Sequence, residues 1–118
     1  ETLVRECTLS AQEIVARIRE AGIVGMGGAT FPTHVKLSVP PGKKAECVII
    51  NGVECEPYLT SDHRTMLEYG EELLVGVTIL MKAVGVGKAY IGIENNKPSR
   101  ICAACPPDTR ASRSSPCR

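Results

Sequence analysis

The segment AECVIIN, residues 45–51, decides the fold of this chain. Its run of Val48, Ile49 and Ile50 has the β-branched side chains and the length of a short strand that is buried on both faces. Strands of this kind occur in parallel sheets, and these need a long connection between one strand and the next. The residues that follow should therefore supply a helix and then a second strand.

Both elements are visible downstream. Residues 71–84 place apolar side chains on one broad face, start with Glu71 and Glu72 and stop before Gly85, which is typical of an amphipathic helix. The segment AYIGI, residues 89–93, is the second strand. A strand, a helix and a strand in this order predict an α/β fold built on a parallel βαβ unit.

A further helix is predicted upstream, over residues 9–22. Ser10 and Glu13 form the S-x-x-E capping box at its start, and Gly22 marks its end. Its buried stripe is expected to consist of Ile14, Val15 and Ile18.

Composition and charge restrict the class of protein. The 118 residues are 43% hydrophobic but only 3% aromatic, so aliphatic side chains must form the core. Residues 1–98 carry ten Lys or Arg against twelve Asp or Glu, a slightly acidic balance that argues against a nucleic-acid partner. The longest apolar run, Leu73–Met81, is far shorter than the ~20 residues of a membrane span, so no direct membrane insertion is expected.

The composition changes after Pro98. Residues 99–118, SRICAACPPDTRASRSSPCR, carry four Arg and one Asp and have no apolar period, so we expect a disordered tail behind a domain of residues 1–98. The abrupt change also suggests a frameshift near residue 98. Cys102 and Cys105 have C-x-x-C spacing without further ligands, so no metal site is predicted.

The segment GMGGATFPTHVK, residues 25–36, follows the first helix. Its glycines lack a Cβ and can bring backbone N–H groups close to an anion such as a phosphate. Lys36 would supply a positive charge, and Phe31 a stacking face. The alternative is a tight turn with a solvated lysine. The pattern is not the Rossmann fingerprint, because a helix precedes it and Thr30 occupies the sixth position.

A second cluster, NGVECEPYLTSDHR, residues 51–64, lies just past the first strand. Open α/β sheets bind ligands beyond the carboxyl ends of their strands, which makes Asn51, Glu54 and Glu56 candidates. An Asn amide can pair with the edge of a flavin or nucleobase, and carboxylates can accept from hydroxyl groups. The alternative is a solvated acidic loop stiffened by Pro57.

These two loops, together with KAVGVGKAYIGIENNKP, residues 82–98, resemble the RnfC family, the C subunit of the Rnf ion-translocating electron-transport complex. More distantly they resemble the flavin-binding subunit of respiratory complex I and of NAD-linked hydrogenases. The resemblance runs from Leu9 to Pro98.

The resemblance implies that FMN is the cofactor and that NADH passes a hydride to it. It implies FMN contacts for Gly25, Gly27, Gly28, Lys36, Asn51 and Glu54, and positions towards NADH for Phe31 and Glu56. The family's iron–sulfur clusters and a later flavin-binding segment do not occur before Arg118, so this chain is expected to be a fragment.

The predicted function is therefore that of part of a subunit that binds FMN, oxidises NADH and passes electrons to iron–sulfur carriers. The subunit is expected on the cytoplasmic side of the bacterial inner membrane, docked on other subunits, with the fragment alone inactive. One alternative is a non-catalytic assembly module or a truncated inactive fragment. Another is a generic phosphate-binding enzyme such as a nucleotide transferase, but the G-x-x-x-x-G-K-[ST] loop is not present.

Overall fold

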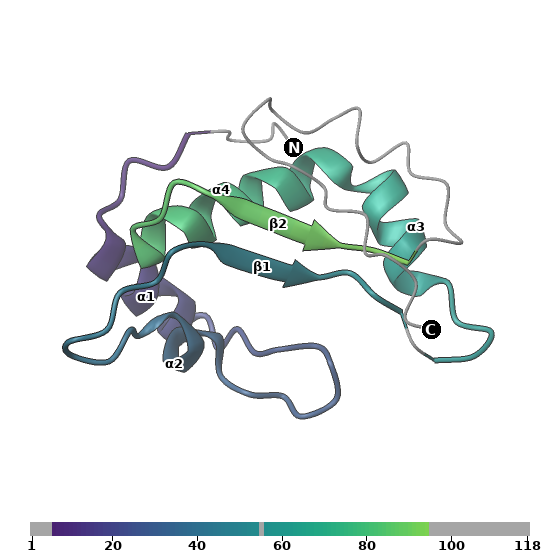
Figure 1. Cartoon of the computed structure of the whole chain (residues 1–118), viewed down its shortest axis with the longest axis horizontal. Helices are drawn as coiled ribbons and strands as arrows, with labels where there is room; N and C mark the ends of the chain where they lie inside the picture. The colour runs from purple at the N-terminus through teal and green to yellow at the C-terminus, as the bar shows by residue number, and fades with distance from the viewer. Residues whose placement is uncertain (1–5, 55, 95–118) are drawn as a thin grey trace.

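The computed structural model describes residues 6–54 and 56–94, and in this part of the chain it confirms the predicted α/β fold (Figure 1). In chain order the elements are α1 (Ala11–Glu20), α2 (Thr33–Leu37), β1 (Val48–Asn51), α3 (Ser61–Glu68), α4 (Gly70–Val84) and β2 (Ala89–Gly92). The two strands pair in parallel, with Val48 opposite Ala89 and Asn51 opposite Gly92. The predicted βαβ unit is therefore present.

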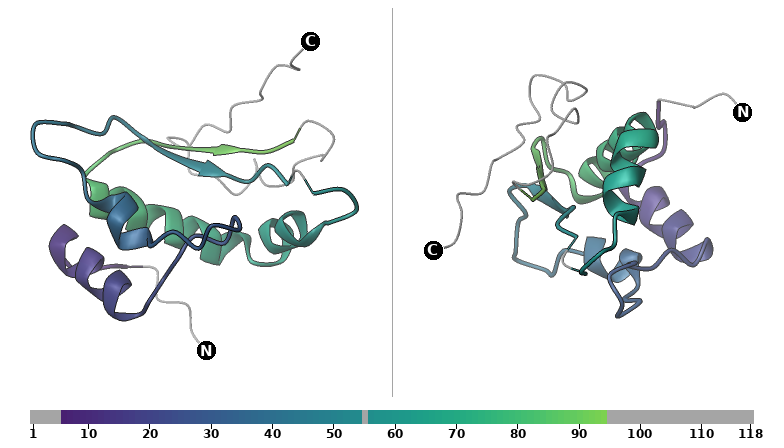
Figure 2. Two further views of the ribbon diagram at one scale, coloured as in Figure 1. Left: turned by 90° about the horizontal axis from the view of Figure 1, so that it is seen from below. Right: turned by 90° about the vertical axis from the view of Figure 1, so that its right-hand side faces the viewer.

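The elements lie in layers. Figure 2 shows the two strands on one side, α4 beneath them and α1 farther away. Val77 of α4 is buried against Ala89 and Ile91 of β2. The opposite side of α4 meets α1, where Ile14 and Ile18 form a buried cluster with Ala83. α4 is thus the central element, packed on both sides by aliphatic side chains.

The prediction that the first strand is buried on both faces is wrong for the described part of the chain. Val48 and Ile50 pack towards α4, whereas Ile49, which points to the other face, is 73% exposed. A run of β-branched residues indicates a strand, but it does not reveal how many layers cover the strand. The described helices cover only one face.

The signals that predicted α1 are present as hydrogen bonds. The Glu13 carboxylate accepts a hydrogen bond from the Ser10 N–H at 2.8 Å, and the Ser10 hydroxyl accepts one from the Glu13 N–H at 3.4 Å. Hydrogen bonds from the Ser10 side chain and backbone hold the pKa of the Glu13 carboxyl below its usual value. At the other end Gly22 is left-handed, and the Ile23 N–H donates to the Ile18 carbonyl at 3.1 Å.

Two helices occupy segments that the sequence indicated only as loops. α2 is a single turn after the glycine loop, and α3 begins ten residues past the end of β1. α3 and α4 follow one another almost without interruption, broken at Tyr69 where the backbone adopts φ −120° and ψ 36°. Gly70 follows directly, and glycines are common at such breaks.

The predictions for residues 99–118 and for a boundary after Pro98 lie outside the described residues. None of the helices that the structure describes has the length and apolar character needed to cross a membrane.

Candidate functional site

The glycine loop is closed at its neck by backbone hydrogen bonds. The Gly25 N–H donates to the Phe31 carbonyl at 2.8 Å, and the Thr33 N–H donates to the Ile23 carbonyl at 3.0 Å. Residues 26–30 therefore project from a fixed base, although they lie in neither a helix nor a strand.

The backbone of this loop adopts unusual conformations. Gly28 has φ 95°, which a residue with a side chain rarely adopts, and Thr30 has φ 49°. A left-handed threonine costs of order 1–3 kcal/mol, and such residues cluster at ligand-binding sites. The shape of the loop is therefore maintained against local strain.

The second loop continues the sheet and then turns. The Gly52 N–H donates to the Gly92 carbonyl at 2.8 Å, which extends the pairing of β1 with β2 by one residue. The Asn51 Oδ1 accepts a hydrogen bond from the Val53 N–H at 3.1 Å. This side-chain turn holds the Asn51 carboxamide in one orientation at the end of β1.

Glu54 is the buried charged residue of this loop, with only 8% of its surface exposed. Its Oε1 accepts hydrogen bonds from the Ser61 hydroxyl at 3.1 Å and from the Asp62 N–H at 3.0 Å, and Oε2 accepts from the His63 N–H at 3.5 Å. These donors form the first turn of α3, whose N-cap residue Thr60 has no side-chain capping bond. Glu54 therefore caps α3 from the preceding loop, where a carboxylate also interacts favourably with the helix dipole.

Replacing Glu54 with Ala is expected to lower the free energy of unfolding by about 1–3 kcal/mol, because the partly buried donors of α3 lose their acceptor. Urea denaturation measures the change. Glu56→Ala is the matched control, since it removes the same charge from an exposed position two residues away and should change stability by less than about 0.5 kcal/mol. Equal effects of the two substitutions would contradict the capping role.

The two loops line one cleft of about 680 Å³ at the carboxyl end of β1, a volume within the range of small-molecule sites. Gly27 and Gly28 contribute from the glycine loop, Asn51 contributes from the end of β1, and Glu54 and Glu56 contribute from the loop after it. The position of the cleft agrees with the rule for open α/β sheets. Five of the eight residues predicted for the site thus meet around one cavity.

The other three predicted residues lie beside the neck of the glycine loop and do not line the cleft. The Lys36 Nζ lies 6.0 Å from the centre of the Phe31 ring, a cation–π distance. A Cβ at Gly25 would collide with the same Nζ. The Lys36 ammonium group therefore lies against Gly25 and brings a positive charge to the base of the loop.

Nothing in the described fold requires Gly27 to be glycine. A Cβ at Gly27 would have no described atom within 4 Å, and the residue does not have a left-handed φ. Gly27 instead lines the cleft, where it presents backbone and no side chain. This is the arrangement expected where a ligand must approach the backbone closely.

Several lining residues were not predicted from the sequence. Met26, Val53 and Leu59 are apolar and exposed, and Ser61, Asp62, Thr65 and Met66 come from α3, a helix that the sequence did not predict. The sequence signal for α3 was the run of Thr60, Ser61 and Asp62 after Pro57, a composition favoured at helix starts.

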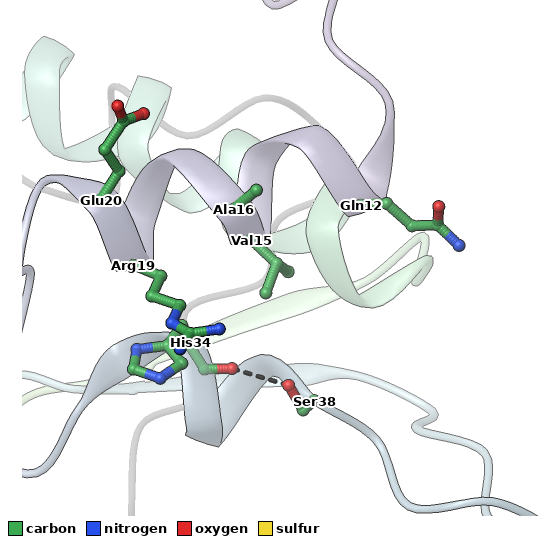
Figure 3. Close-up of a pocket in the computed structure, with 7 residues that line it drawn as sticks. All are labelled: Gln12, Val15, Ala16, Arg19, Glu20, His34 and Ser38. Carbon is green, nitrogen blue, oxygen red and sulfur yellow. Dashed lines mark hydrogen bonds between the residues drawn. The ribbon is translucent and has the colours of Figure 1, made fainter.

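A second cavity of about 570 Å³ lies between α1 and α2 (Figure 3). Arg19 contributes from α1 and His34 and Ser38 contribute from α2 and its end, with the Ser38 hydroxyl donating to the His34 carbonyl at 2.8 Å. The groove shares no lining residue with the cleft. Across the described ranges no three His, Cys, Asp or Glu side chains gather as metal ligands.

Comparison with known proteins gives this cleft a context. The chain is 60% identical over 93 residues to the C subunit of the proton-translocating ferredoxin:NAD(+) oxidoreductase complex of Clostridium ljungdahlii, an alignment that covers 79% of this chain and 20% of that protein. It is 54% identical to the C subunit of the Na(+)-translocating ferredoxin:NAD(+) oxidoreductase complex of Acetobacterium woodii, over 79% of this chain and 21% of that protein. The C subunit of the ion-translocating oxidoreductase complex of Rhodobacter capsulatus is 51% identical over 76% of this chain and 17% of its own length.

The chain thus spans about a fifth of the length of these relatives. A match to a whole family of domains also covers most of the chain. Residues 18–112, which include both loops, match the Nuo51 FMN-binding domain family. This chain belongs to the Nuo51 FMN-binding domain family.

Proposed function

We propose that this chain is the FMN-binding segment of an NADH-oxidising subunit in a membrane-associated electron-transport complex, and that the cleft between the two loops holds the flavin. FMN is the cofactor of the family to which the chain belongs. The location of the flavin rests on one observation. Gly27, which the described fold does not require to be glycine, lines the same cleft as Asn51.

The described residues fit such a cofactor. One wall offers a backbone without side chains at Gly27 and Gly28, which permits close approach of a ligand. The facing loop offers the Asn51 carboxamide, already held by the Val53 N–H, to recognise a heterocyclic edge. A site that is organised before the ligand arrives loses less entropy on binding.

When bound, FMN accepts a hydride and releases the electrons singly to one-electron carriers. The task of the protein is to hold the ring in one orientation and to leave one face accessible to NADH. In this proposal Phe31, which is 49% exposed beside the neck of the loop, and the exposed Glu56 lie towards NADH. The subunit lies on the cytoplasmic side of the membrane, binds the other subunits there and passes electrons to iron–sulfur carriers.

A flavin titration tests the proposal. The intact protein, meaning the full product of the gene that carries this segment, is titrated with FMN while flavin fluorescence and absorbance are followed. We expect saturable quenching and a shifted flavin spectrum, followed by bleaching when NADH is added without oxygen. A non-catalytic assembly module would leave the flavin spectrum unchanged, and that result would overturn the proposal.

Lys36→Ala in the same protein is expected to weaken FMN retention by roughly fivefold to tenfold, because a nearby positive charge is worth about 1 kcal/mol to a bound anion. The dissociation constant for FMN measures the effect. Lys43→Ala is the control, since Lys43 is an exposed lysine in the Pro40–Lys43 turn and does not line the cleft. Unchanged flavin affinity in Lys36→Ala would remove this residue from the proposed site.

A further inference from the structure

The groove between α1 and α2 brings together two basic side chains. Figure 3 shows that Arg19 points from α1 towards His34 of α2, whereas Glu20 points away from both. Glu20 instead pairs with Arg17, at 3.6 Å between the Glu20 Oε2 and the Arg17 Nη1. Within residues 6–54 and 56–94 the side chains of Arg19 and His34 have neither a hydrogen bond nor an ion pair. The hydrogen-bond donors of the Arg19 guanidinium are therefore available to an anion.

The surface around these two side chains is partly apolar. Val15 of α1 lines the groove, and the Ser38 hydroxyl at its edge is already engaged with the His34 carbonyl. Val35 and Val39, which follow His34 and Ser38 in the chain, are 46% and 40% exposed. A mixture of exposed apolar side chains and an arginine is typical of a surface that contacts protein.

The charge around the groove indicates what kind of chain would cover it. Residues 21–45 contain Lys36, Lys43 and Lys44 but no Asp or Glu, whereas residues 46–72 contain seven Asp or Glu and one Arg. Figure 1 shows α1 and α2 at one end of the molecule and α3, which belongs to the acidic stretch, at the other. The complement of the groove is therefore an acidic segment, and it comes from outside the described fold.

We propose that the groove between α1 and α2 is the docking site for an acidic segment of the same protein that lies outside residues 1–118. A carboxylate of this segment binds the Arg19 guanidinium beside His34, and its apolar side chains cover Val35 and Val39. The planar guanidinium can hold a carboxylate by two parallel hydrogen bonds. The proposal does not depend on flavin binding, because the groove and the cleft share no lining residue.

The size of the groove favours a segment of the same protein over a separate partner. A cavity of about 570 Å³ with one arginine offers a small contact, and stable interfaces between separate proteins bury at least ~1,000 Å². A tethered segment needs only a weak contact, because the tether raises its effective concentration. This chain spans about a fifth of the length of the relatives that it matches, so a protein of their length has ample chain for the purpose.

The test is a cross-linking experiment on the intact protein, alone and in its purified complex. Arg19→Lys keeps the positive charge and supplies a primary amine, which a water-soluble carbodiimide joins to a neighbouring carboxylate as an amide, the carbodiimide taking up the water as a urea. Mass spectrometry should find position 19 joined to an Asp or Glu of the same protein outside residues 1–118. Arg17→Lys is the control, since position 17 faces Glu20 and should be joined to that residue.

Reversing the charge gives a second readout. Arg19→Glu should release the segment, so that the amide hydrogens of its cross-linked stretch exchange about tenfold faster in the intact protein. Arg17→Glu makes the same charge change on the same helix at a residue that does not line the groove, and it should leave this exchange unchanged.

Three results would overturn the proposal. Position 19 could give no cross-link, or join only to residues within 1–118, in which case nothing acidic from outside covers the groove. It could join to another subunit in the purified complex, which would make the groove an interface between subunits. Equal effects of Arg19→Glu and Arg17→Glu on hydrogen exchange would show that the groove does not hold the segment.

Discussion

Gly52→Ala is expected to destabilise the protein by about 1–3 kcal/mol, because a methyl group at this position has no room. A Cβ at Gly52 would lie 3.0 Å from the Gly92 carbonyl oxygen and 3.1 Å from the Met66 Sδ. To relieve the contact, the Gly92 oxygen has to move by a few tenths of an ångström, which lengthens the hydrogen bond that it accepts from the Gly52 N–H. The substitution therefore strains the pairing of β1 with β2 at the point where the cleft begins, and FMN affinity should fall as well.

Thermal and urea denaturation measure this effect. Gly76→Ala is the control, because Gly76 lies inside α4 and a Cβ there has no described atom within 4 Å. Alanine favours a helix interior over glycine, so this control should stabilise the protein by about 0.5–1 kcal/mol. A Gly52→Ala protein as stable as the original would show that the packing around Met66 is looser than described.

Gly27→Val is expected to lower FMN affinity by about a hundredfold while leaving the stability unchanged. The side chain would project into the cleft where the ligand approaches the backbone. Overpacking a filled space costs about 1–3 kcal/mol, which at its upper end is about a hundredfold in affinity. Stability should not change, because the described fold leaves open space at this Cβ and does not require a left-handed φ. A binding defect without a folding defect separates this glycine from Gly52.

Gly87→Val provides the comparison for Gly27→Val. Gly87 lies between α4 and β2, a Cβ at this position would also have no described atom within 4 Å, and the residue does not line the cleft. The substitution should change neither stability nor flavin affinity. If both valine substitutions reduce affinity equally, the loss at Gly27 comes from a general disturbance and not from the cleft.

The parts of the fold that could be predicted from the sequence carry local signals. α1 has its capping box within four residues, and α4 has acidic residues in its first turn and a left-handed Gly85 after its last. α3 was missed because its cap is not local, since the Glu54 carboxylate seven residues upstream accepts from the Ser61 hydroxyl. α2 is a five-residue turn, too short to produce an apolar period.

The candidate site was predicted in outline for a similar reason. Asn51 ends a recognisable strand, so its place at the carboxyl end of the sheet followed from topology. The different surroundings of the glycines within the glycine loop could not be predicted in this way. The Lys36 ammonium group lies against Gly25 while Gly27 lines the cleft, and this difference depends on a tertiary contact that residue spacing does not record. The lining residue Leu59 was missed because a single apolar residue in a loop carries no chemical signal in a sequence.

We propose that the glycine loop and the loop after β1 hold the flavin between them. A structure of the intact protein determined with FMN present tests this most directly. We expect flavin density in the cleft that Gly27 and Asn51 both line. Flavin bound elsewhere, for example in the groove between α1 and α2 beside Arg19, with the cleft holding only solvent, would contradict it.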